Sequence, residues 1–331
     1  MDANFKWASN RLPPLHPVQE DVAPTPDIVT WTNIADFQVY MPEGGTTLYA
    51  NGQQQLKVRV SVRVKNKDHA TVALDEYALS SLQLVDAGTG QPLVHGKVRP
   101  GDPIGWRYVL ERNDAFKPLP YQGQIAGGLL GAKVYSRDFY VSTNARTSIS
   151  LLASITRADG TVFYSEAIKA HGRVTLNSIP PAVYSQNQFQ LRFHGKTPYA
   201  SKHISKVEVY QLTLIVEQHK VDIIKLNSVY PGVYLRKSEH PDYLGYYASA
   251  YVGGESRLDD VVLFELPHAQ AKYHNYPGAV TLLMSYAKKG GDSQIRFEYD
   301  MWTLEVLDMY GNTHTVTVKA SEQSPPVLKL S

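Results

Sequence analysis

The segment from Leu56 to Lys65 alternates strictly between apolar and polar side chains, and this pattern constrains the fold more than any other feature. The apolar set is Leu56, Val58, Val60, Val62 and Val64, and the polar set is Lys57, Arg59, Ser61, Arg63 and Lys65. On a β-strand, a period of two places one set in a core and the other in water. A helix would scatter the valines around its axis and restrict their branched side chains. We therefore predict a strand whose basic outer face is solvated and discourages edge-to-edge pairing.

Short runs with strand character recur along the chain at spacings of roughly 8–15 residues. Besides Leu56–Lys65, the predicted strands are Phe37–Met41, Ser81–Asp86, Trp106–Leu110, Lys133–Val141, Ser148–Thr156, Thr161–Glu166, Phe189–Phe193, Val207–Val216, Val221–Leu226, Val261–Leu266, Ala279–Tyr286, Gln294–Val306 and Thr313–Lys319. The last two are joined by turn-forming residues at 308–312, which predict a hairpin. Helical spacing is confined to Asp75–Leu82, where one turn would point Leu74, Tyr77 and Leu82 inward. Many short strands without alternating helices predict sandwiches or barrels.

The chain of 331 residues is long enough for two domains of ordinary size. Paired prolines near residue 180 interrupt the strand pattern, so we predict one domain over residues 31–180 and a second, with Tyr-rich loops, over 181–331. Residues 1–30 are rich in proline and predict an extended arm, either free or lying on its own chain, or docked on a neighbouring subunit. The predicted fold is all-β, with two antiparallel β-sandwich domains of immunoglobulin-like or jelly-roll topology.

Residues 46–92 carry a local resemblance to a known class of module. The segment TTLYANGQQQLKVRVSVRVKNKD, followed by LQLVDAGTGQPL, resembles the opening of bacterial immunoglobulin-like modules of invasin-type adhesins and phage virion proteins. Such modules often begin with an Ala-Asn-Gly turn and an alternating valine strand. The resemblance implies a non-catalytic module in a surface or particle protein.

Several catalytic classes lack the residues that they require. The chain has no cysteine, which excludes disulfides, thiolate catalysis and iron–sulfur ligation. Its histidines show no spacing typical of metal ligands, and there is no Gly-x-Ser-x-Gly elbow. Gly123 and Gly128 have phosphate-loop spacing, but Leu129 and Leu130 stand where that loop needs lysine and a hydroxyl residue. We predict no catalytic residue, no metal and no cofactor.

Two acidic pairs are the remaining candidates for catalysis. Glu298 and Asp300 would share one face of a strand, with carboxyl groups roughly 7 Å apart, a separation that a glycosidase can use. Arg296 would lie on the same face, so a salt-bridged, solvated strand is the simpler interpretation. Asp259 and Asp260 fit a loop or the start of a strand.

Tyrosine is over-represented, with 22 in the chain and a concentration after residue 229. The candidate partner- or ligand-binding residues are Tyr230, Tyr234, Tyr243, Tyr246, Tyr247 and Tyr251. Residues 239–256 contain so much glycine, proline and polar sequence that they are not expected to form a single core strand. Tyrosine combines rigid area with a polar tip, which favours interfaces, and its ring also stacks on sugars. Three interpretations stay open: covered sandwich edges, a subunit interface, or glycan binding.

Charge and targeting signals set the expected partners and location. The 33 basic and 31 acidic side chains nearly cancel, so we expect no nucleic-acid partner, although the basic strand could touch an anionic surface. The first residues show no apolar run typical of a secretory signal, and no stretch has the roughly 20 apolar residues of a membrane helix. We expect synthesis in the cytoplasm, with release by lysis or presence in a virion.

The first functional hypothesis is a non-enzymatic structural or attachment protein of a phage, tailocin or similar bacterial particle, acting through contacts with other protein subunits or with itself. The second is a pore-forming bacterial toxin that contacts a membrane, based on the Ser- and Thr-rich alternating run Tyr140–Ile155. The third is a polysaccharide-binding or polysaccharide-degrading β protein.

Overall fold

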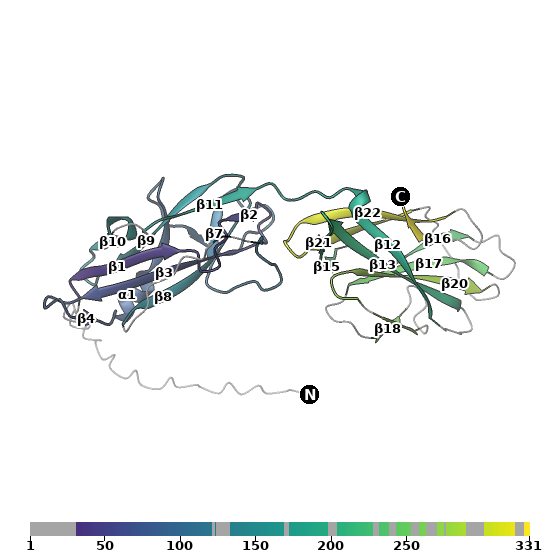
Figure 1. The fold of residues 1–331 in the computed structure, drawn as a ribbon, viewed down its shortest axis with the longest axis horizontal. Helices are drawn as coiled ribbons and strands as arrows, with labels where there is room; N and C mark the ends of the chain where they lie inside the picture. The colour runs from purple at the N-terminus through teal and green to yellow at the C-terminus, as the bar shows by residue number, and fades with distance from the viewer. Residues whose placement is uncertain are drawn as a thin grey trace, which may run out of the picture.

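The computed structural model describes residues 31–120, 123, 133–168, 172–197, 204–227, 232–237, 243–252, 258–262, 270–274, 276–288, 301–321 and 328–331. The fold is all-β, as the sequence predicts, and it consists of two sandwiches that lie end to end (Figure 1). The predicted arm over residues 1–30 lies outside the described residues. Within the described ranges, no helix is both long and apolar enough to cross a membrane.

The N-terminal sandwich packs two main sheets face to face. One has the strand order β1-β3-β8-β7-β6, with β4 beside β3, and the other has the order β10-β9-β11-β2, with β5 beside β9. The bounds are β1 (Asn33–Tyr40), β2 (Thr47–Tyr49), β3 (Leu56–Lys65), β4 (Thr71–Val72), β5 (Gln83–Asp86), β6 (Val94–His95), β7 (Trp106–Val109), β8 (Tyr135–Thr143), β9 (Ile149–Thr156), β10 (Val162–Tyr164) and β11 (Val174–Ile179). Most neighbouring strands are antiparallel, but β2 pairs with β11 and β6 with β7 in parallel.

The alternation over Leu56–Lys65 is confirmed by β3, where Val58, Val60 and Val62 are fully excluded from solvent. These valines pack in one core with the inward residues of β9 in the opposite sheet. The expected role in protecting an edge is wrong, because β3 lies between β1 and β8 and has no free edge.

The short helix α1 (Glu76–Ser81) occupies the segment with helical spacing. Asp75 caps it by accepting a hydrogen bond from the backbone N–H of Ala78 at 2.7 Å. Leu82 is buried as expected, whereas Tyr77 is exposed and Ala78 takes the inward position. The prediction for Tyr77 is therefore wrong, because the helix turns the neighbouring Ala78 towards the core and Tyr77 away from it.

The C-terminal sandwich has a separate core between two further sheets. Their strand orders are β12-β13-β20-β17-β16, with β14 beside β13, and β15-β21-β22-β23, and a ribbon of β18 and β19 accompanies them. The bounds are β12 (Phe189–Thr197), β13 (Ile204–Val216), β14 (His219–Val221), β15 (Ile223–Leu226), β16 (Gly232–Lys237), β17 (Tyr243–Val252), β18 (Leu258–Val262), β19 (Gln270–His274), β20 (Val280–Lys288), β21 (Met301–Asp308), β22 (Thr313–Ala320) and β23 (Leu328–Leu330). The predicted hairpin at 308–312 is confirmed by the antiparallel pairing of β21 with β22.

The Tyr-rich segment gives the main correction to the sequence prediction. β17 is a ten-residue strand inside the sheet, paired with β16 on one side and β20 on the other. Ala248 and Ala250 supply its core face. The prolines and most glycines of this region lie outside the strand, and the internal Gly245 stands at a register irregularity, so their number does not prevent strand formation.

The alternating run on which the toxin hypothesis is based, Tyr140–Ile155, is divided between β8 and β9. These strands belong to opposite sheets of the N-terminal sandwich and each pairs with other partners. Leu151, Ala153 and Ile155 lie in the core. The run is therefore not a hairpin in this fold.

Candidate functional site

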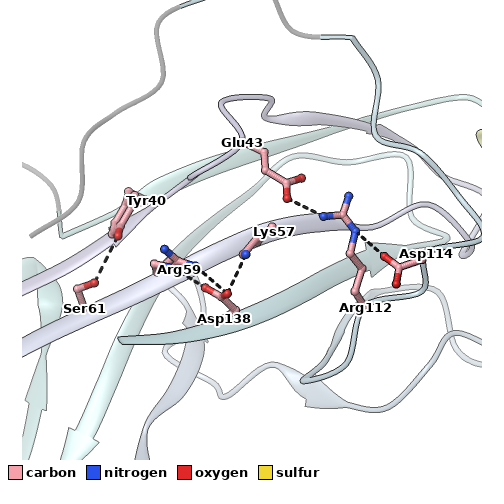
Figure 2. Close-up of polar contacts among 8 residues, drawn as sticks. All are labelled: Tyr40, Glu43, Lys57, Arg59, Ser61, Arg112, Asp114 and Asp138. Atoms are coloured by element: carbon pink, nitrogen blue, oxygen red, sulfur yellow. Dashed lines mark hydrogen bonds and ion pairs between the residues drawn. The ribbon is translucent and has the colours of Figure 1, made fainter. Parts of the chain in front are cut away.

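The basic face of β3 is largely neutralised by acidic neighbours (Figure 2). Asp138 of β8 bonds Nε of Arg59 at 2.5 Å and Nη2 of Arg59 at 2.9 Å, and it lies 2.8 Å from Nζ of Lys57. These bonds, first of all those from Arg59, hold the pKa of Asp138 below its ordinary value. Arg63 pairs in the same way with Asp36 of β1. The face is a paired network and not a free basic stripe.

A second, separate group of ion pairs holds the loop that follows β7. Arg112 places Nη1 2.6 Å from Glu43 and Nε 3.3 Å from Asp114 (Figure 2). The backbone N–H of Asn113 donates to the side chain of Gln55 at 2.7 Å. These contacts tie the loop to the N-terminal sandwich before it reaches the C-terminal one.

The predicted tyrosine site has a defined backbone arrangement. Tyr234 lies in β16, opposite Tyr247 of β17, and Tyr246 and Tyr247 face Tyr286 and Ser285 of β20 in the register. The remaining tyrosines of the prediction are placed as follows: Tyr243 begins β17, Tyr251 lies near its end and is half-buried with a pKa raised by burial, and Tyr230 lies outside the described residues. The register brings these residues onto adjacent strands, and their binding role stays a prediction.

Within the described residues, neither acidic pair is placed in a catalytic arrangement. Asp259 and Asp260 are near the start of β18, opposite Tyr273 and Lys272 in the register. Glu298 and Asp300 lie outside the described residues. Within the described ranges, no group of three or more His, Asp or Glu side chains is placed to hold a metal ion.

Several polar contacts between distant parts of the chain lie where the two sandwiches meet. We call this region the junction: Tyr49, Asn51, Gln53, Gln54, Lys117 and Leu119 on one side, and Tyr184, Asp222, Asp308, Met309, Tyr310, Gly311, Asn312 and His314 on the other. Asn51 is its centre. Its Nδ2 donates to the carbonyl of Tyr310 at 2.9 Å and to Oδ1 of Asn312 at 3.0 Å.

The turn that carries Asn51 is fixed by its own side chain. Oδ1 of Asn51 accepts the backbone N–H groups of Gln53 at 2.9 Å and Gln54 at 3.0 Å. The amide group of Gln54 is fully buried, accepts from the N–H of Tyr49 at 2.7 Å and donates to the carbonyl of Lys117 at 2.8 Å. The turn within the first sandwich therefore holds Oδ1 of Asn51, and this fixes the direction in which Nδ2 points towards the second sandwich.

Further contacts cross the junction beside Asn51. The N–H of Lys117 donates to the carbonyl of Met309 at 2.7 Å. Tyr49 and Leu119 pack against the core of the C-terminal sandwich, and the rings of Tyr49 and Tyr310 are 6.2 Å apart. Gly311 lies so close to the first sandwich that a Cβ built on it would be 2.6 Å from Cβ of Gln53. The contact combines apolar burial with directional hydrogen bonds.

The β21–β22 hairpin presents the other side of the junction, and its shape depends on the buried Asp308. One carboxylate oxygen accepts the backbone N–H groups of Tyr310 at 2.9 Å and Asn312 at 2.8 Å. The other accepts Nδ2 of Asn312 at 3.1 Å and Nε2 of His314 at 3.0 Å. Because Nδ2 of Asn312 is used by Asp308, its Oδ1 faces Asn51. The hairpin therefore requires a donor at position 51.

Aromatic rings close the junction around His314. Tyr184 lies over the His314 ring with centroids 4.8 Å apart, and its hydroxyl shares a hydrogen bond with that of Tyr49. Burial raises the pKa of Tyr184, and Tyr49 and Asp308 add to the increase; burial also raises the pKa of Tyr49. Nδ1 of His314 is buried and has no hydrogen-bond partner within the described residues. The junction thus combines packed aromatic rings with the buried carboxylate of Asp308, and at its side Lys117 lies 3.8 Å from the carboxylate of Asp222.

Sequence analysis identifies the two turns of the junction but not their contact. Asn51 and Gly52 appear as a turn within the resemblance, and residues 308–312 appear as a hairpin. They lie 259 positions apart at the Asn51–Tyr310 contact, and no local pattern connects them. The spacing Asp-x-x-x-Asn at 308–312 fits a turn closed by its own side chains, but it does not reveal what the turn contacts.

Comparison with known families finds no family that matches this chain. No curated protein matches it either. Among solved structures, the crystal structure of the S-layer protein SbsC domains 4 and 5 is similar at 11% sequence identity with a TM-score of 0.18. The alignment covers 87% of this chain and 98% of that one. Likeness at this level carries no conclusion about fold or function.

Proposed function

We propose that the protein is a non-enzymatic structural subunit that acts through protein–protein contacts, with its two sandwiches joined as one rigid unit. The observation that carries the proposal is the Asn51 amide, which bonds the hairpin of the second sandwich through both of its donor hydrogens. Domains joined by a linker normally move relative to each other unless their interface is specific and apolar. Here the interface has both properties, which suits a protein that holds its outer surfaces at a fixed separation.

A phage, tailocin or similar bacterial particle is the proposed setting. The resemblance of residues 46–92 to immunoglobulin-like modules of virion proteins supports it, as does an architecture of stacked sandwiches. An exposed apolar side chain on an edge strand, such as Phe193 on β12, provides contact area for a neighbouring subunit. The toxin and polysaccharide hypotheses stay predictions from the sequence.

Rigidity is tested by a distance measurement across the junction. Because the chain has no cysteine, Val162→Cys and Thr315→Cys introduce two unique labelling sites, one on each sandwich. Both positions are exposed. We expect double electron–electron resonance between spin labels to give one narrow distance distribution. A broad distribution in the otherwise unchanged chain would contradict a rigid unit.

Assembly is tested by light scattering over a range of concentrations. We expect a mass above the 36.9 kDa of one chain that rises with concentration. A strict monomer throughout would count against contacts between copies.

Replacing Tyr246 and Tyr247 with serine tests the predicted interface. If the prediction is correct, association weakens while the fold survives. If these residues only support the strand, the stability of the fold decreases instead.

A further inference from the structure

The centre of the junction coincides with the one Asn-Gly pair of the sequence, Asn51-Gly52. In such a pair, the backbone nitrogen after the asparagine can attack the side-chain carbonyl carbon, and glycine permits this more readily than other residues because it has no Cβ. Gly52 has a φ of +72° and lies against Val98, so the chain requires glycine there for its own turn. The fold therefore fixes this reactive pair at the contact between the sandwiches.

We propose that Asn51 is a deamidation site whose modification converts the rigid junction into a hinge, and this inference rests on the proposed function above. The Gly52 nitrogen forms a bond to Cγ of Asn51, the bond from Cγ to Nδ2 breaks, and ammonia leaves with the proton from the Gly52 N–H. Water then opens the cyclic imide at either carbonyl. The product is aspartate or isoaspartate, and no oxidant or reductant is required.

The electrostatic consequence follows from the partners of Asn51. Its Nδ2 faces two acceptors, the carbonyl of Tyr310 and Oδ1 of Asn312. A carboxylate in its place would set oxygen against oxygen at both contacts. Asn312 cannot rotate its amide to present a donor to this carboxylate, because its Nδ2 donates to the buried Asp308. One deamidation therefore removes both hydrogen bonds and adds a repulsion.

The turn within the first sandwich would survive the same change. Oδ1 of Asn51 accepts from the N–H groups of Gln53 and Gln54, and a carboxylate oxygen accepts equally well. Aspartate at position 51 thus separates the two functions of the side chain: it keeps the local turn and loses the contact with the second sandwich. Isoaspartate also lengthens the main chain by one carbon and disturbs the turn.

The folded junction also controls when the reaction occurs. The N–H of Gly52 donates to the carbonyl of Thr143 at 2.9 Å, which keeps the attacking nitrogen occupied. The side-chain oxygen of Asn51 is held by two further N–H groups. We expect deamidation of Asn51 to be slow while the junction is closed and faster while it is open. A molecule that is deamidated in the open state then stays open.

The test combines ageing of the spin-labelled chain with two variants. After incubation at mildly alkaline pH, we expect a mass gain of about one dalton, located at Asn51 by peptide mapping. The deamidated fraction and Asn51→Asp should both show a distance distribution broader than that of the unaged chain. Asn66→Asp is the matched control, because Oδ1 of Asn66 also accepts two backbone N–H groups of its own turn, those of Asp68 and Ala70, away from the junction. We expect it to leave the distribution narrow.

Two results would overturn the inference. One is a narrow distribution in Asn51→Asp, which would show that the amide donors do not hold the sandwiches together. The other is full retention of the Asn51 amide in the aged folded chain while the urea-unfolded chain deamidates there. A distance distribution that is broad in the unaged chain, while the mass at Asn51 shows an intact amide, contradicts the rigid unit itself. That result is a failure of the proposed function and is distinct from the two failures of the deamidation inference.

Discussion

Nε2 of His314 donates to the carboxylate of Asp308 at 3.0 Å, and both side chains are fully excluded from solvent. The same carboxylate accepts three further hydrogen bonds from the turn that it begins. All four of its acceptor positions are thus used within one hairpin. These four hydrogen bonds compensate for the burial of the carboxylate. They also fix the conformation of the turn that Asn51 contacts.

Asp308→Ala should lower the free energy of unfolding of the C-terminal sandwich by about 3–5 kcal/mol, because it leaves buried donors without an acceptor. Asp308→Asn should cost less, since one amide oxygen still accepts the backbone N–H groups of Tyr310 and Asn312. Urea denaturation followed by tryptophan fluorescence compares the two variants. Equal losses would show that the backbone bonds contribute little.

Gly311→Ala should destabilise the junction through a direct clash with Gln53. Gly311 has a φ of +85°, and Gly160, in the turn between β9 and β10, has a φ of +86° with no atom within 4 Å of the place where a Cβ would lie. Gly160→Ala therefore reports only the backbone strain, about 1–2 kcal/mol. Gly311→Ala should cost about 1–3 kcal/mol more through overpacking and should broaden the distance distribution between the sandwiches. Equal costs in thermal unfolding would contradict the close approach.

Asp138 should make the stability of the N-terminal sandwich depend on acid pH. Its pKa is lowered in the folded state, chiefly by the bonds from Arg59 and then by Lys57. A lowered pKa contributes stability that is present above the unfolded value of about 3.9 and is lost as the pH falls through the folded value. Asp138→Asn should cost about 1 kcal/mol at neutral pH, because the group is partly exposed. The difference from the unchanged chain should shrink as the pH falls below about 4; a difference that stays constant with pH in denaturation experiments would exclude the ionic cause.

The strand pattern could be predicted where alternation is strict. Leu56–Lys65 has the same bounds in the sequence prediction and in the structure, because the period of two in its side chains matches the two faces of a strand and places the apolar set in the core. β17 could not be predicted in this way, since its core face consists of the small Ala248 and Ala250 and carries little hydrophobic signal. Glycine and proline near its ends were given too much weight, although turn residues at strand ends are ordinary.

The junction could not be predicted because its specificity resides in orientation. Asn51 and Asn312 are common turn residues in the sequence, and each would fit any β protein. They form a specific contact because Asp308 binds Nδ2 of Asn312, so that Oδ1 of Asn312 faces Asn51 and position 51 must supply a hydrogen-bond donor. Such a dependence runs through three residues from two sandwiches, and neither periodicity nor spacing encodes it.

Glu208 should contribute strongly to the stability of the C-terminal core despite its charge. It is buried and accepts from Nζ of Lys206 at 3.1 Å and from the hydroxyls of Tyr210 at 3.0 Å and Tyr286 at 2.7 Å. Glu208→Leu removes the acceptor that these three donors share and should cost about 3–5 kcal/mol in urea denaturation. Glu208→Gln keeps one acceptor oxygen and should cost less. Combining Glu208→Leu with Tyr286→Phe should recover part of the loss, because one buried hydroxyl is then absent; strictly additive losses would mean that the hydroxyl does not depend on Glu208.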